Sequence, residues 1–80
     1  MSQHTFLHNN LEILFGYEYV FDGFFLVITR KGDFTTVFSN LNLRNPAMTI
    51  FQIEGILKEH NIPVPENLEE VLTSDREAGE

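Results

Sequence analysis

The sequence has no cysteine, and only five of its 80 residues are lysine or arginine. Without cysteine the chain has no disulfide, no thiolate metal ligand and no thiol nucleophile. Direct binding to nucleic acid is not expected, because affinity for phosphate rests on clustered lysine and arginine. No stretch reaches the roughly 18 uninterrupted apolar residues of a membrane-spanning helix, and residues 1–10 lack the pattern of a secretory signal. These absences predict a cytoplasmic protein that contacts neither membrane nor nucleic acid.

The patterns that mark nucleotide-binding loops, zinc proteases and serine hydrolases are also missing. What the sequence does have is apolar material, with 42% hydrophobic residues and eight phenylalanines, which is enough for a folded core. The length allows one domain. We therefore expect a single folded domain that is not an enzyme and that holds no cofactor and no metal.

Acidic residues outnumber basic ones by 12 to 5, which gives a net charge of −7 and a pI near 4.7. The excess is concentrated at the C-terminus, where residues 61–80 hold one base and six acids, a net of 1 − 6 = −5. The polar stretch 73–80 is predicted to be a disordered acidic tail. The folded domain is then 1–72, in which residues 1–10 are poorly ordered, extend the sheet through Phe6-Leu7 or add a covering turn.

Residues 11–39 alternate like a three-stranded antiparallel meander. Asp22-Gly23 between two phenylalanines predicts a two-residue type I′ turn that pairs Phe21 with Phe24. Arg30-Lys31-Gly32 predicts a three-residue loop with Gly32 in the left-handed conformation. This register gathers the aromatic residues on one face, and a one-residue slip would move every side chain to the other face. The predicted core face holds Ile13, Phe15, Tyr17, Tyr19, Phe21, Phe24, Leu26, Ile28, Phe34 and Phe38.

The second face of this sheet is unexpectedly apolar. Val20, Phe25 and Val37 align as one cross-strand row, and Leu14 and Val27 lie close to it. An antiparallel sheet with one wet face normally carries polar residues at such positions. The row therefore has to be covered, either by the C-terminal segment 62–72 or by another protein chain, and large exposed apolar patches mark interaction sites.

Asn45-Pro46 has the pattern of a helix N-cap followed by proline at the first helical position, which predicts a helix to about Asn61. Gly55 within it is expected to permit close packing against the sheet. A short second helix starts at Pro65 and carries an apolar stripe of Leu68, Val71 and Leu72. The predicted fold is α+β: a three-stranded antiparallel β-meander packed against one main α-helix, with a short C-terminal helix.

Few polar residues stand out as candidate sites. His4 and His8 have the spacing of a helical metal pair, but no third ligand is near, so we interpret them as exposed or capping residues. His60 is interpreted as stabilising a helix C-terminus. Glu18 lacks a catalytic partner and is interpreted as a charge that limits wrong strand pairing. Arg44 and Asn45, before the main helix, form a possible anion-binding site.

The sequence thus favours a small non-catalytic protein-interaction or regulatory module that forms a homodimer. The predicted interface is the second face of the sheet, with Leu14, Val20, Phe25, Val27 and Val37. One alternative is an acidic inhibitor that imitates nucleic acid in the basic cleft of another protein. Another is a binder of small ligands, with a pocket near Tyr17, Tyr19 and Arg44.

Overall fold

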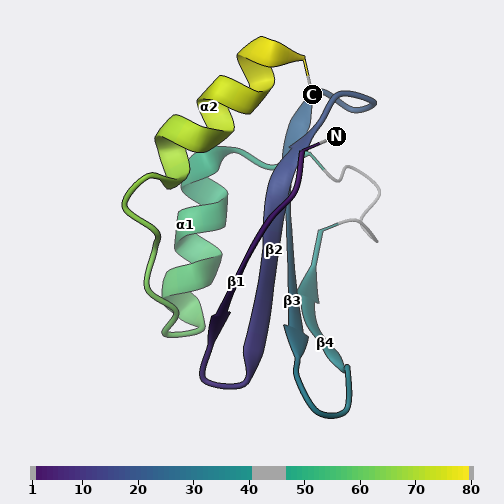
Figure 1. The fold of residues 1–80 in the computed structure, drawn as a ribbon, viewed down its shortest axis with the longest axis vertical. Coiled ribbons are helices and arrows are strands. Elements are labelled where there is room, and N and C mark those ends of the chain that lie inside the picture. The colour runs from purple at the N-terminus through teal and green to yellow at the C-terminus, as the bar shows by residue number, and fades with distance from the viewer. Residues whose placement is uncertain (1, 41–46, 80) are drawn as a thin grey trace.

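The structure, a computed structural model, describes residues 2–40 and 47–79. It has two layers, a four-stranded antiparallel sheet and two α-helices that both pack on one face of it (Figure 1). The strands lie in the sheet in the order of the sequence. Their bounds, followed by those of the helices, are β1 His4–His8, β2 Leu11–Glu18, β3 Gly23–Arg30, β4 Thr36–Ser39, α1 Ile50–Glu59 and α2 Leu68–Ala78. The predicted α+β class is confirmed, whereas the predicted number of three strands is wrong.

The additional strand is β1, which pairs with β2 through a two-residue turn at Asn9 and Asn10. Both asparagines have positive φ, 45° and 65°. This is the requirement of a type I′ turn, and asparagine meets it at low steric cost. Of the alternatives for this segment, the structure therefore has the extension of the sheet, over His4–His8.

The register of β2 against β3 differs from the prediction by four residues, because Phe24 pairs with Tyr17 and not with Phe21. Residues 19–22 form a four-residue loop in which Asp22 takes positive φ and its N–H donates to the carbonyl of Tyr19. Position 23 requires glycine because there is no room for a side chain, and not because of its backbone conformation. A Cβ there would lie 2.5 Å from the Cβ of Ala47. A shift of four preserves the face of every side chain, so the two faces of β2 and β3 are as predicted.

The β3–β4 connection is also longer than predicted. Arg30 donates to the carbonyl of Thr35 at 2.7 Å, and the loop between them contains Gly32 with positive φ, as expected. Phe34 also takes positive φ and is exposed, which corrects its placement in the core. A β-bulge then shifts the register, so that Phe38 lies opposite Ile28.

The edge of β3 beyond β4 is occupied by two further segments. The Asn40 side chain, fully buried, accepts a hydrogen bond from Leu26 N–H at 2.9 Å and donates to the carbonyl of Phe24 at 3.2 Å. Met48 then pairs with Phe24 through two backbone hydrogen bonds of 3.1 and 3.2 Å. Asn40 and Met48 are thereby both attached to β3, and Met48 is the residue before the N-cap of α1.

Helix α1 begins at Ile50 and not near Asn45-Pro46, which lie outside the described residues. Its N-cap is Thr49, which forms a reciprocal capping box with Gln52. The capping box satisfies two backbone donors at once and so fixes the start of the helix. At the other end, the ring of the C-cap residue His60 lies 2.9 Å from the carbonyl of Ile56. This supports the interpretation of His60 as a helix-terminal residue.

Helix α2 begins later than Pro65 and extends to Ala78, so residues 73–78, expected to be disordered, form its last turns. Two side chains attach this part to the rest of the molecule. Asp75 bonds to His4 at 2.6 Å, and Arg76 lies 3.6 Å from Asp22. The two contacts join residues that are 71 and 54 positions apart in the sequence. Composition alone does not indicate such contacts.

The hydrophobic core lies between the helices and the covered face of the sheet. Of the predicted core face, the structure buries the six residues on β2 and β3, leaves Phe38 on β4 and Phe21 in the loop half-buried, and exposes Tyr19 and Phe34. From the helices, α1 contributes Ile53 and Leu57, and α2 contributes Leu68 and Leu72. The buried core is Ile13, Phe15, Tyr17, Phe24, Leu26, Ile28, Ile53, Leu57, Ile62, Leu68 and Leu72.

Candidate functional site

The predicted row of Val20, Phe25 and Val37 does not form. Val20 lies in the β2–β3 loop and is 76% exposed, because the register shift removes it from the sheet. Val37 is the extra residue at the β-bulge and packs against the core. Phe25 does lie on the second face but is fully buried, with its ring over Gly16.

The other two predicted interface residues, Leu14 and Val27, are brought together. They are direct cross-strand partners on the face of the sheet opposite to α1 and α2, and both are half-buried. Leu7 of β1 lies on the same face, in the next row of the β1–β2 pair, and is 59% exposed. We call Leu7, Leu14 and Val27 the open-face patch. Leu7 was missed because β1 was not recognised as a strand.

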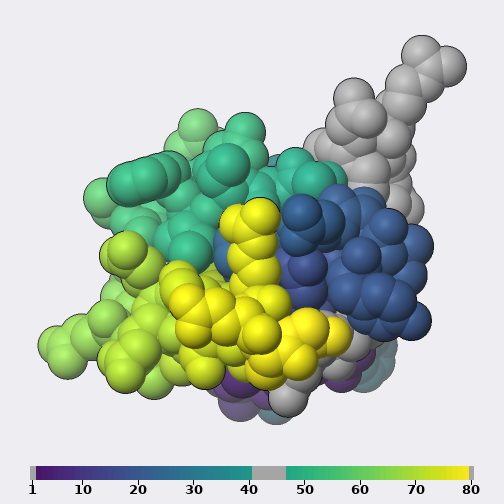
Figure 2. Space-filling model, turned by 90° about the horizontal axis from the view of Figure 1, so that it is seen from above, coloured from purple at the N-terminus to yellow at the C-terminus, as the bar shows by residue number. Residues whose placement is uncertain are grey.

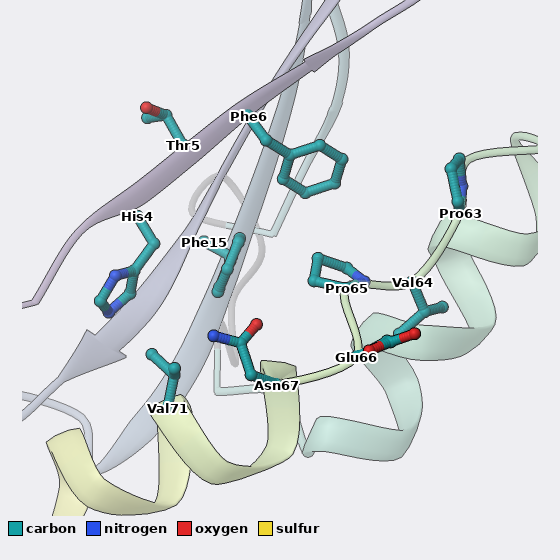
Figure 3. Close-up of a pocket in the computed structure, with 10 residues that line it drawn as sticks. All are labelled: His4, Thr5, Phe6, Phe15, Pro63, Val64, Pro65, Glu66, Asn67 and Val71. Carbon is teal, nitrogen blue, oxygen red and sulfur yellow. The ribbon is translucent and has the colours of Figure 1, made fainter.

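A second feature was not predicted at all, a groove of about 540 Å³ between β1 and the segment that joins the two helices. Its floor is apolar, formed by Phe6 and Phe15 with Val71 of α2 (Figure 3). The opposite wall is the linker 63–67, from which Pro65 points toward the phenylalanines. We call this feature the β1 groove. The available signals were the Asn9-Asn10 turn, which makes β1 a strand, and the Pro-Val-Pro linker.

At one end of the β1 groove, a polar cluster connects the N-terminal segment to α2. His4 Nε2 lies 2.6 Å from Asp75 Oδ2, and the Ser2 hydroxyl bonds to the same carboxylate. Ser2 also accepts a hydrogen bond from Tyr17 N–H and donates its own N–H to the Tyr17 carbonyl, both at 2.9 Å. Burial alone raises the pKa of Asp75, but the hydrogen bonds from His4 and Ser2 outweigh it and leave this pKa below its usual 3.8.

The cluster makes a prediction about stability at low pH. A carboxylate whose pKa is depressed by folding stabilises the native state above its unfolded pKa, and this stabilisation disappears as pH falls through the folded pKa. We expect Asp75→Asn to lower the free energy of unfolding by about 1 kcal/mol near pH 7, the usual size of one hydrogen bond. Below pH 3.8 the difference should shrink toward zero.

Urea unfolding of both proteins at the two pH values measures this difference. Glu77→Gln, on the exposed side of α2, is the matched control and should change stability little at either pH. An Asp75→Asn defect that is equally large at both pH values would show that the carboxylate charge is not involved.

A second cluster fixes the other side of α2. The Tyr17 hydroxyl donates to Asp22 at 2.6 Å, and this bond to a carboxylate is the main reason that the pKa of Tyr17 is raised. Asp22 also lies 3.6 Å from Arg76, so the β2–β3 loop lies beside the C-terminal half of α2 (Figure 2). Tyr17 is therefore engaged within the fold, and Tyr19 is exposed in the loop. The structure does not bring them together as one ligand pocket.

The remaining candidate residues have local roles or are not described. Glu18 accepts a hydrogen bond from Val20 N–H at 3.2 Å, which is a contact within the β2–β3 connection. Arg44 and Asn45, the predicted anion site, lie outside the described residues. Over residues 2–40 and 47–79, no three side chains of His, Cys, Asp or Glu are grouped so that they could hold a metal ion.

Comparisons with known proteins do not identify the chain. No family model matches it, and no curated protein and no solved structure matches it either. Within the described part of the chain, neither helix is long and apolar enough to cross a membrane. Any functional assignment therefore rests on the chain's own surfaces.

Proposed function

We propose that the protein is a small non-catalytic interaction module that self-associates through the open face of its sheet. The observation that supports this proposal is the one-sided placement of the helices. Both pack on the same face, and the other face carries the open-face patch with Leu7 59% exposed. An apolar patch of this kind is stabilised when a second surface removes it from water.

A second copy of the chain is the occupant that the patch fits best. None of its three residues is charged, so two identical patches meet without placing like charges opposite each other at the centre. Glu12 is paired with Leu7 across β1 and β2, at the margin of the patch, where a charge stays solvated. Two-fold self-association needs only such a self-complementary surface.

Light scattering over a concentration series tests the proposal. We expect the wild type to approach twice its monomer mass of 9.3 kDa, and Leu7→Glu to remain a folded monomer. Leu7 is chosen because a charge at a half-exposed strand position disturbs the interface more than the fold. Phe51→Glu is the matched control, since Phe51 is 84% exposed on α1, on the other side of the sheet.

The control should dimerise like the wild type. A wild type that stays monomeric up to about 1 mM, where even an association worth roughly 4 kcal/mol would be half formed, contradicts the proposal. So does a Leu7→Glu variant that remains dimeric.

A further inference from the structure

The outer edge of β1 has backbone groups that point away from the sheet. In a two-residue hairpin the residues next to the turn, His8 and Leu11, exchange both hydrogen bonds, and the pattern then alternates along the strands. At the other end of this strand pair, Ser2 N–H donates to the Tyr17 carbonyl at 2.9 Å, as the alternating pattern requires. The N–H and C=O groups of Thr5 and Leu7 are therefore directed outward.

This edge lacks the features with which proteins usually protect an edge strand. β1 has the sequence His-Thr-Phe-Leu-His, with no proline, no lysine and no bulge. Among residues 2–40 and 47–79, β2 is the single strand that pairs with it. The segment across the β1 groove cannot take this place, because Pro63 and Pro65 have no N–H to donate.

The β1 groove lies beside this edge, on the side of the helices (Figure 3). Successive side chains of a strand added to β1 would point alternately to the two faces of the sheet. One set would enter the groove between Phe6, Phe15 and Val71, and the other would meet the open face near Leu7. A strand that fits therefore has apolar residues at alternate positions.

The charged residues around the groove determine whether a positive or a negative ligand is favoured. Glu66 is on its wall, and none of the ten residues that line it is lysine or arginine. Glu69 and Glu70 in the first turn of α2 continue the acidic surface next to it. Electrostatic complementarity of this kind favours a positively charged partner and speeds its association.

We propose that the outer edge of β1 and the β1 groove together bind an extended, positively charged segment of a partner protein, which adds to the sheet as a fifth strand. In this mode of recognition, main-chain hydrogen bonds provide affinity and pockets for alternate side chains provide specificity. The inference goes beyond the proposed self-association, because it rests on the backbone of β1 and on the helix-side groove, and it meets the open-face patch only beside Leu7.

The first experiment selects binders from a displayed library of random nine-residue peptides. Enriched sequences should combine lysine or arginine with apolar residues at every second position. Hydrogen exchange then locates the bound peptide on the protein. The amides of Thr5 and Leu7 should exchange at least about tenfold more slowly in the complex, whereas the amide of Phe6, already bonded to β2, should change little.

Two variants separate the backbone edge from the charged rim. Thr5→Pro removes an N–H that β2 does not use, and proline is tolerated on edge strands, so binding should be lost while the fold is kept. Glu66→Lys reverses an exposed rim charge and should weaken a basic peptide roughly fivefold. Glu59→Lys, exposed on α1, is its control and should bind like the wild type.

The selected peptide provides a test that leaves the protein unchanged. N-methylation of its alternate amides should abolish binding in one register and be tolerated in the other, because only every second amide of an added strand faces β1. The inference is overturned if no peptide is enriched, or if enriched peptides leave the amides of Thr5 and Leu7 in rapid exchange.

Protection of these two amides in the free protein, rising with protein concentration, would assign the edge to a second copy and also overturn the inference. Peptide binding is measured on Leu7→Glu as well as on the wild type. The two proposals then fail separately, since that variant keeps the backbone of β1 and the β1 groove, and only the peptide side chains beside Leu7 meet the new charge.

Discussion

Leu72→Ala is expected to lower the free energy of unfolding by about 2–5 kcal/mol, the usual cost of truncating a fully buried leucine. The total for a chain of 80 residues is on the order of 4–12 kcal/mol, so the variant should lose a substantial part of its stability. Leu72 is completely buried on α2, which packs against β2. The contact joins residues that are far apart in sequence, and Leu72 shares it with Leu68, which is also buried one turn earlier on α2.

Urea unfolding followed by circular dichroism measures the effect, with Thr73→Ala as the control. Thr73 is the next residue of the same helix but is exposed, so its replacement should change stability by less than about 0.5 kcal/mol. If the two variants were equally stable, α2 would not be part of the cooperative core, and residues 73–78 would behave as the disordered tail that the composition indicates.

Gly16→Ala is expected to destabilise the fold by about 1–3 kcal/mol, as overpacking of a tight site usually does. A Cβ at Gly16 would lie 2.1 Å from the carbonyl oxygen of Ser2 and 2.9 Å from the ring of Phe25. The first of these is a backbone atom of Ser2, and the N–H and hydroxyl of the same residue bond to Tyr17, so the oxygen cannot move far without breaking this pairing. The residue must be glycine because of this close approach, since its φ is not positive.

Gly55→Ala is the matched control, and its effect on the free energy of unfolding should have the opposite sign. A Cβ at Gly55, inside α1, would meet no atom within 4 Å. Alanine there should therefore stabilise the protein by about 0.4–1 kcal/mol through helix propensity and a less flexible unfolded chain. Thermal unfolding of both variants shows whether each substitution raises or lowers the stability of the protein. A Gly16→Ala variant as stable as Gly55→Ala would contradict the packing of Ser2 over β2.

The sequence predicted the faces of the sheet better than the pairing of its strands. The side-chain period of two assigned Ile13, Phe15, Leu26 and Ile28 to the core, and all four are buried. The register was wrong by four residues, an even number, which leaves each face unchanged. Alternation therefore determines which side chains face the core, whereas the turns determine which residues pair.

The turns were mispredicted because tertiary contacts act on them. Asp22-Gly23 has the pattern of a two-residue turn, but the Tyr17 hydroxyl binds Asp22 and Ala47 packs on Gly23. The first contact spans five residues and the second 24, so neither is contained in the dipeptide, and the propensity of the dipeptide alone gave the wrong loop length. The Asn9-Asn10 turn follows the local rule, although it was not recognised, and its contact with Lys31, whose N–H donates to the Asn10 carbonyl at 2.7 Å, is compatible with that rule.

The candidate site was predicted only in part for a related reason. Leu14 and Val27 were placed on the correct face by alternation, and Leu7 was missed together with β1. The β1 groove depends on where the linker 63–67 and α2 pack relative to β1. That arrangement is set by contacts such as His4 with Asp75, 71 residues apart, which no local pattern contains.

The segments that cover the outer edge of β3 limit the number of strands that can be added to the sheet. Beyond β4, the side chain of Asn40 and the backbone of Met48 occupy the remaining edge of β3, and β4 itself is four residues long beside a bulge. Short and bulged edges do not accept further strands readily. Polymerisation into a fibre requires two strand edges on each molecule that can pair, because each molecule in the fibre contacts one neighbour on either side. With β1 as the usable edge, strand addition ends after one step in a finite complex, and the sheet does not serve as a template for indefinite growth.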